Sequence, residues 1–165
     1  LFGSAVDLVV RTYLKGGRLY IAGNGGSAAD AQHLAAEFVS KLARPRAPLP
    51  AEALTVDSSI LTAIGNDFGY DQVYSRQIAG KMTSKDVFLA ITTSGKSPNI
   101  LRALEECRRL EIPSIVLAGN GGGSAKLLAD IAIVASGETT SSIQELHVVL
   151  YHSLCECVEL ALFPV

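Results

Sequence analysis

The stretch "AGNGGSAADAQHLAAEF" at residues 22–38 decides the fold class. It leaves a short apolar run through adjacent glycines and a serine and enters an alanine-rich segment. We therefore predict a buried strand, a tight turn and a helix. Glycines let another group approach the backbone closely, and a helix N-terminus offers free N–H groups to an anion. A simple turn capped by Ser27 explains the glycines equally well. The spacing differs from dinucleotide and P-loop patterns, so neither ligand is indicated.

Apolar runs and helical patterns alternate along the rest of the chain. The expected strands are 18–23, 52–56, 86–92, 113–119 and 130–136. The expected helices are 1–17, 26–42, 70–80, 98–110, 122–128 and 140–162, with a proline-rich loop at 44–50. Such alternation is typical of an α/β fold with a parallel sheet and helices on both faces.

Composition excludes several classes of protein. The chain has 165 residues and a net charge of −2, which fits one domain and gives no general reason to expect nucleic-acid binding. No apolar run is long enough to span a membrane, and no signal peptide is evident. The cysteines, Cys107, Cys155 and Cys157, are typical of reduced thiols in a cytoplasmic protein. The chain does not begin with methionine, so we expect a truncated N-terminal helical segment.

A hydroxyl-rich loop follows the third expected strand. The sequence TTSGKSPN at 92–99 contains Thr92, Thr93, Ser94 and Ser97 around one glycine, just before a helix. Hydroxyls and helix N-terminal amides together can hold a phosphate monoester. An ordinary helix cap is the alternative, but one cap does not need four hydroxyls. Asn66 and Asp67, which follow the second strand, are a weaker indication of sugar binding because Asn-Asp before a glycine is also common turn chemistry.

His33 and Glu37 are four residues apart and share a helix face. An imidazole and a carboxylate suit a transition metal such as zinc. A surface hydrogen bond is the alternative interpretation. The other histidines, His147 and His152, lie in the last helix near Gln144, which favours a metal site.

Four segments carry a resemblance to a known family. They are GNGGSAADAQHLAAEF (23–38), SSILTAIGNDFGYDQVYSRQ (58–77), TTSGKSPNILRAL (92–104) and SSIQELHVVLYHSLCECVE (141–159). In these segments the chain resembles the phosphoheptose isomerases, which belong to the sugar isomerase (SIS) domain group. The resemblance implies a single three-layer αβα domain over residues 1–165, a mainly parallel five-stranded sheet, and a homotetramer with active sites between subunits.

The resemblance also implies roles for individual residues. The zinc ligands would be His33, Glu37, Gln144 and His152, with Glu37 and His152 as the catalytic acid–base pair. The substrate-binding residues would be Asn24, Gly25, Gly26, Glu37, Asn66, Asp67, Thr92, Thr93, Ser94, Ser97 and Gln144. Ser141, Ser142 and Lys41 depart from the residues that relatives often carry there.

Simple geometry conflicts with part of this ligand set. Gln144 and His152 are eight residues apart, about 12 Å along an ideal helix, so one straight helix cannot easily bring both to one ion. Either the helix begins after Gln144, or a neighbouring chain supplies one ligand. His147 is the locally better partner of Gln144, but the resemblance aligns His152 with the family histidine.

The implied reaction interconverts sedoheptulose 7-phosphate and D-glycero-D-manno-heptose 7-phosphate through an enediol, for bacterial heptose and lipopolysaccharide synthesis. It needs a base for a C–H proton, an acid for the neighbouring oxygen and a group that polarises the carbonyl. The alternatives are an isomerase of another sugar phosphate and a catalytically silent SIS protein that acts by protein–protein contact.

Overall fold

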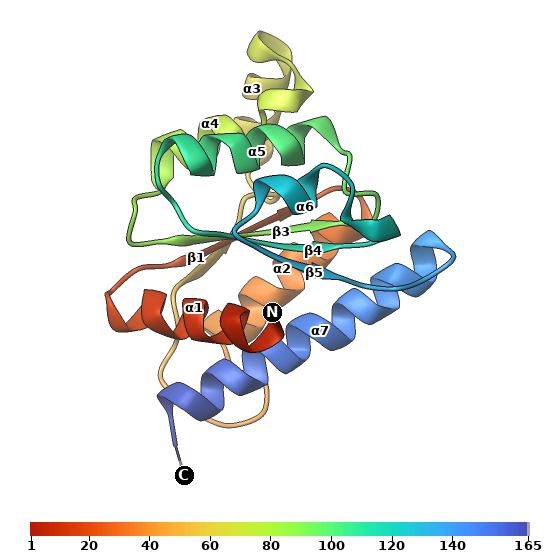
Figure 1. Ribbon diagram of the computed structural model, residues 1–165. Coiled ribbons are helices and arrows are strands. Elements are labelled where there is room, and N and C mark those ends of the chain that lie inside the picture. Colours follow the sequence, from red (N-terminus) through yellow and green to blue (C-terminus); the bar gives the residue numbers. More distant parts are fainter. Residues whose placement is uncertain (165) are drawn as a thin grey trace.

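A five-stranded sheet forms the centre of the molecule (Figure 1). The computed structural model describes residues 1–164. The strand order is β2-β1-β3-β4-β5, and every neighbouring pair is parallel. The strands are β1 (Leu19–Gly23), β2 (Ala51–Ala53), β3 (Val87–Thr92), β4 (Ser114–Ala118) and β5 (Ile131–Val134). The three inner strands are buried at every position, as expected for a parallel sheet covered on both faces.

Two helical layers cover the sheet, so the predicted three-layer αβα fold is confirmed (Figure 1). One layer holds α1 (Phe2–Leu14), α2 (Gly26–Val39) and α7 (Thr140–Leu162); the other holds α4 (Ser75–Lys81), α5 (Pro98–Arg109) and α6 (Ala125–Leu128). Alternate strand residues enter opposite cores: Ile21 and Leu89 pack with the first layer, whereas Ala22 and Phe88 pack with the second.

The expected elements differ from the structure mainly between residues 51 and 81. Strand β2 is shorter and begins before the predicted 52–56. A helix that the sequence reading did not predict, α3 (Ser58–Phe68), follows it, capped by the Asp57 side chain, which accepts from the Ile60 amide. None of its residues is fully buried, and it projects beyond the helical layer in Figure 1. The expected helix 70–80 divides into a 3₁₀ turn, η1 (Tyr70–Gln72), and α4.

The carboxyl ends of β1, β3 and β4 bring three loops to one edge. Gly23 pairs with Ile91, so the glycine turn after β1 lies beside the hydroxyl loop after β3. The third loop contains the 3₁₀ turn η2 (Asn120–Gly122) and packs on Gly95, whose carbonyl accepts from the Ala125 amide. A side chain at Gly95, where φ is +64°, would collide with the carbonyl group of Gly122. Only glycine therefore permits this close packing of the two loops.

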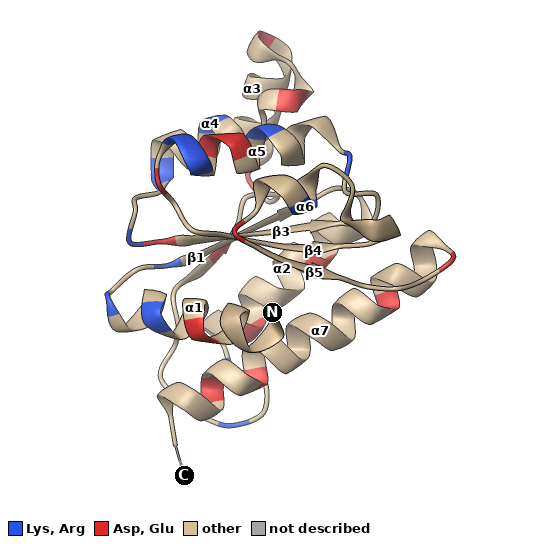
Figure 2. Ribbon diagram, viewed as in Figure 1, with Lys and Arg blue, Asp and Glu red and all other residues tan. Residues whose placement is uncertain are grey.

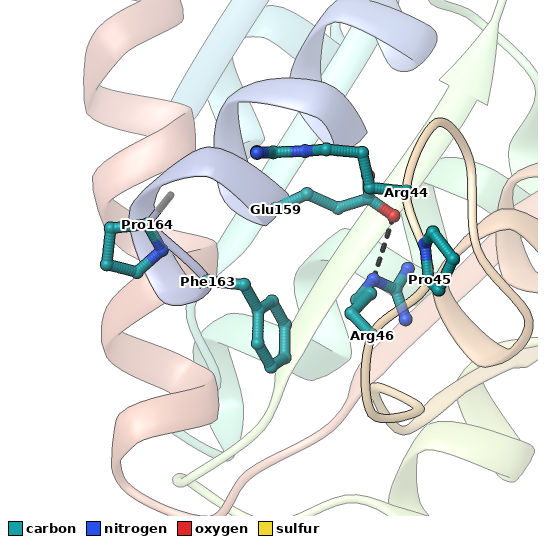
Figure 3. A pocket seen from close by; sticks show the side chains of 6 residues that line it. All are labelled: Arg44, Pro45, Arg46, Glu159, Phe163 and Pro164. Atoms are coloured by element: carbon teal, nitrogen blue, oxygen red, sulfur yellow. Dashed lines mark hydrogen bonds and ion pairs between the residues drawn. The ribbon is translucent and has the colours of Figure 1, made fainter.

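The loop after α2 is fastened to the last helix by a buried ion pair. Arg46 Nε lies 2.8 Å from Glu159 Oε1, and both side chains are almost fully buried (Figure 3). Arg46 also donates to the carbonyl oxygens of Glu37 and Phe38 at 2.8 and 2.7 Å. This arginine thus ties the end of α2 to α7.

Acidic and basic residues occur together on the outer helix α5 (Figure 2). Arg102 pairs there with Glu105, and Arg109 pairs with Glu106. The last helix, α7, carries acidic residues but no lysine or arginine. Among the residues described, we find no helix with the length and apolarity required to traverse a membrane.

Candidate active site

A cavity of about 240 Å³ opens at the edge where β1 and β3 end. Its lining consists of Asn24, Gly26, Ser27, Ile91, Thr92, Thr93, Ser97, Thr140 and Gln144. Six of the substrate-binding residues expected from the sequence are in this set: Asn24, Gly26, Thr92, Thr93, Ser97 and Gln144. The fold therefore brings the glycine turn, the hydroxyl loop and the start of α7 together around one space.

The hydroxyls of the 92–97 loop differ in whether they form hydrogen bonds within the loop. Thr92 Oγ1 accepts from the Gly95 amide, and Ser94 Oγ accepts from the Lys96 amide, so both hydroxyls help to shape the loop. Ser97 is the N-cap residue of α5, but its side chain makes no capping hydrogen bond. The simple-cap interpretation therefore does not describe Ser97, whose hydroxyl is available to a ligand.

A second group of polar side chains lies along α2 and α7. His33, Glu37 and His152 each offer a ligand atom, and these atoms lie within 4.8 Å of one another. His33 Nε2 is 3.1 Å from Glu37 Oε1. His152 Nε2 is buried and has no hydrogen-bond partner among residues 1–164. Two imidazoles and a carboxylate with an unsatisfied buried nitrogen fit a zinc-type cation.

The two histidines of α7 have different surroundings. His147 is fully buried and lies outside the group formed by His33, Glu37 and His152. Burial lowers the pKa of His147, so its imidazole is favoured in the neutral form. The five-residue separation turns the two histidines to different faces of α7. The structure therefore places His152, and not His147, beside His33.

Gln144 and His152 belong to one continuous helix, since α7 begins at Thr140. Of the two alternatives that the sequence left open, a helix that begins after Gln144 is therefore excluded. Gln144 instead lies against the glycine turn: a side chain at Gly26 would collide with its amide group. Within one chain, Gln144 belongs to the cavity, and His152 belongs to the His–Glu–His group.

Several of the expected substrate residues lie away from the cavity lining. Asn66 and Asp67 are exposed on α3, where the Asn66 side chain donates to Asp67 Oδ1 at 2.7 Å. Gly25 is the N-cap residue of α2, with φ of +56°, and is exposed. Ser94 is also absent from the lining. These four residues, together with Glu37 of the His–Glu–His group, do not line the cavity within one chain.

Comparisons with known proteins identify the family of the chain. A family model described as the SIS domain matches residues 2–119. The phosphoheptose isomerase of Citrifermentans bemidjiense is 48% identical over 160 residues, covering 97% of this chain and 83% of that protein. The solved phosphoheptose isomerase structures from Neisseria gonorrhoeae and Francisella tularensis match with TM-scores of 0.90 and 0.91, at 37% and 36% identity. They cover 96% and 95% of this chain, respectively, and 84% of each of those chains. The chain belongs to the phosphoheptose isomerase family of SIS-domain enzymes.

Sequence reasoning missed residues that position the site of this phosphoheptose isomerase family member. Asn99 exchanges two side-chain hydrogen bonds with Asn24, at 2.9 and 2.8 Å, and so pins the glycine turn to α5. Tyr74 donates to the carbonyl oxygen of Gly23 at the same turn. Tyr151 contacts His33 and Asp30 behind the His–Glu–His group. Asn99 is adjacent to the hydroxyl loop and Tyr151 to His152, but only their long-range contacts distinguish these side chains from ordinary core residues.

Proposed function

We propose that this protein interconverts sedoheptulose 7-phosphate and D-glycero-D-manno-heptose 7-phosphate. The observation that carries the proposal is the pairing of a hydroxyl-lined cavity with a His–Glu–His group in a chain 48% identical to a curated phosphoheptose isomerase. The cavity suits the substrate phosphate, because Thr93 and Ser97 present hydroxyls beside the N-terminus of α5. Binding the phosphate would fix the reacting carbons of the sugar.

The chain's own residues can move the proton that the reaction requires. Glu37 takes a proton from C1 of the ketose, the carbon next to the carbonyl group, and returns it to C2, the former carbonyl carbon, while His152 gives a proton to the oxygen on C2 and takes one from the oxygen on C1. The proposed cofactor is zinc, held by His33, Glu37 and His152 together with Gln144. When bound, zinc would polarise the substrate carbonyl and stabilise negative charge on its oxygen.

We further propose a homotetramer in which Gln144 serves the metal site of a neighbouring copy. Support comes from the unbroken helix α7, along which Gln144 and His152 are about 12 Å apart. The same helix exposes Leu146, Val149 and Leu160, which a partner could cover. Light scattering at micromolar concentration should report a mass four times that of the chain. A monomer that is fully active would contradict this assembly.

The cellular setting proposed for the enzyme is the cytoplasm, where it would supply heptose for lipopolysaccharide. Cys107, Cys155 and Cys157 are all free thiols, which suits a reducing compartment. Burial raises the pKa of the Cys107 thiol to about 12, so this cysteine should be chemically inert.

The function is tested by a coupled assay with sedoheptulose 7-phosphate, run beside zinc analysis of the purified protein. We expect formation of the aldose phosphate, loss of activity after chelation and recovery when zinc is restored. Turnover of a shorter sugar phosphate alone would reassign the substrate. A protein that binds neither zinc nor any sugar phosphate would instead match the silent regulatory class.

The phosphate loop is tested by replacing Ser94 and Ser97 together with alanine. We expect KM for the sugar phosphate to rise at least tenfold, because the change removes one hydroxyl that lines the cavity and one that shapes the loop. The thermal midpoint should change little, since neither side chain is in the core. The half-buried Ser153 on α7, replaced by alanine, is the control. Equal KM values in the two variants would show that the 92–97 loop does not bind the substrate phosphate.

A further inference from the structure

The imidazole of His33 has a hydrogen-bond partner at each nitrogen. Nε2 lies 3.1 Å from Glu37 Oε1, whereas Nδ1 lies 2.9 Å from the hydroxyl oxygen of Tyr151. Tyr151 comes from α7 and is completely buried. Its hydroxyl also lies 3.4 Å from Oδ1 of Asp30, one turn before His33 on α2. A chain of three polar groups thus runs from the His–Glu–His group into the contact between α2 and α7.

The positions of the protons decide which hydrogen bonds His33, Tyr151 and Asp30 can make to one another. A ring nitrogen that binds a cation must offer a lone pair, so with Nε2 on the metal the proton of neutral His33 must sit on Nδ1. The Tyr151 oxygen can accept that Nδ1–H, while its own proton goes to the Asp30 carboxylate, which only accepts when ionised. Without a cation, Nε2–H can donate to Glu37, and the same hydroxyl can turn to donate to Nδ1. The Tyr151 hydroxyl can therefore form a hydrogen bond with either neutral tautomer of His33, as acceptor from Nδ1–H or as donor to unprotonated Nδ1.

We propose that Tyr151, with Asp30 as its acceptor, is a positioning residue that holds His33 in its metal-binding form. The inference rests on the proposed function, since it assumes that His33 is a metal ligand. It adds two residues, Tyr151 and Asp30, that contact the proposed ligand His33 or each other and are not themselves proposed ligands.

The aromatic ring of Tyr151 makes a separate contribution that the test must hold constant. It packs edge-on against His33 and His152, with ring centroids 5.6 and 4.9 Å apart. Replacing Tyr151 by phenylalanine keeps these contacts and removes only the hydroxyl. The matched control is Tyr13→Phe on α1, because the Tyr13 hydroxyl is also buried but has no hydrogen-bond partner within residues 1–164.

The experiment measures zinc affinity by competition with a chromogenic chelator at constant pH. We expect Tyr151→Phe to bind zinc 10- to 100-fold more weakly than the unaltered protein, as is usual when a partner of a metal-bound histidine is lost. Tyr13→Phe should bind zinc normally. An unchanged affinity in Tyr151→Phe would overturn the inference while leaving the proposed function intact. An unaltered protein that does not bind zinc would overturn both.

A second readout follows the proton on His33 directly. In the zinc-loaded protein, ¹⁵N NMR should show a protonated Nδ1 protected from solvent exchange, and Tyr151→Phe should lose that protection. Asp30→Asn should also weaken zinc binding, because its amide can donate to the tyrosine oxygen and so compete with His33. This variant keeps the test decisive if Tyr151→Phe folds poorly. Full protection in both variants would contradict the proposed positioning.

Discussion

Replacing Glu37 by glutamine should lower kcat for the sugar phosphate by about a hundredfold or more, the usual effect of losing a general base. Glutamine keeps the size of the side chain and one oxygen that can face His33 or a metal, but it cannot accept the substrate proton. The 92–97 loop is the proposed phosphate site and does not include Glu37, so substrate affinity should change little. The first measurement is steady-state kinetics on the zinc-loaded variant.

The decisive measurement for Glu37 is exchange of deuterium from solvent into C1 or C2 of the substrate. Exchange should fall in parallel with kcat, because both require abstraction of the same proton. Zinc content must be measured in the same samples, so that loss of the base is separated from loss of the metal. Glu105→Gln is a suitable control, since Glu105 is half-exposed on the outer face of α5. Exchange at the unaltered rate in Glu37→Gln would assign the base to another residue.

Replacing Glu159 by glutamine should lower the free energy of unfolding by about 3–5 kcal/mol, the usual result of removing one partner from a buried ion pair. The carboxylate faces Arg46 at 2.8 Å, and the two side chains are 3% and 2% exposed (Figure 3). Without its partner, the guanidinium charge of Arg46 remains buried. Arg46 also holds the Glu37 carbonyl, so the end of α2 should loosen as well.

Chemical denaturation at neutral pH measures this loss, with the exposed Glu156→Gln on the same helix as the control. The control should lie within about 0.5 kcal/mol of the unaltered protein. Burial alone would raise the pKa of Glu159, but hydrogen bonds from the Leu42 amide and Arg46 outweigh it, and the pKa falls below its ordinary value of 4.5. The stabilisation is therefore full above pH 4.5 and disappears as the pH falls through the lowered pKa. A loss in Glu159→Gln no larger than that of the control would show that the pair contributes little.

The sequence by itself determined the elements whose signals are local. Buried parallel strands appear as short apolar runs, so all five strands and the αβα layers could be predicted from residue order. The glycine turn at 23–26 and the hydroxyl loop at 92–97 are likewise local, because each needs particular residue types at consecutive positions. Since parallel strands align their carboxyl ends, the sequence also indicated that these two loops would meet.

The tertiary structure decided which side chains share a site. Helical periodicity alone does not show which face of α7 meets α2, and it therefore could not separate His147 from His152. The packing of the two helices places His152 beside His33 and buries His147. It also leaves Gln144 beside the glycine turn, about 12 Å from His152.

Local sequence patterns also could not predict which residues far apart in the sequence contact one another. Helix α3 has no fully buried residue, so its apolar pattern gave only a weak signal. The sequence therefore indicated either weak sugar binding or a simple turn at Asn66 and Asp67, and not a helix. Tyr151 meets Asp30 and His33 across more than 110 residues of chain. Such pairs depend on how two helices cross, and the crossing is set by the packing of the whole core rather than by any one segment.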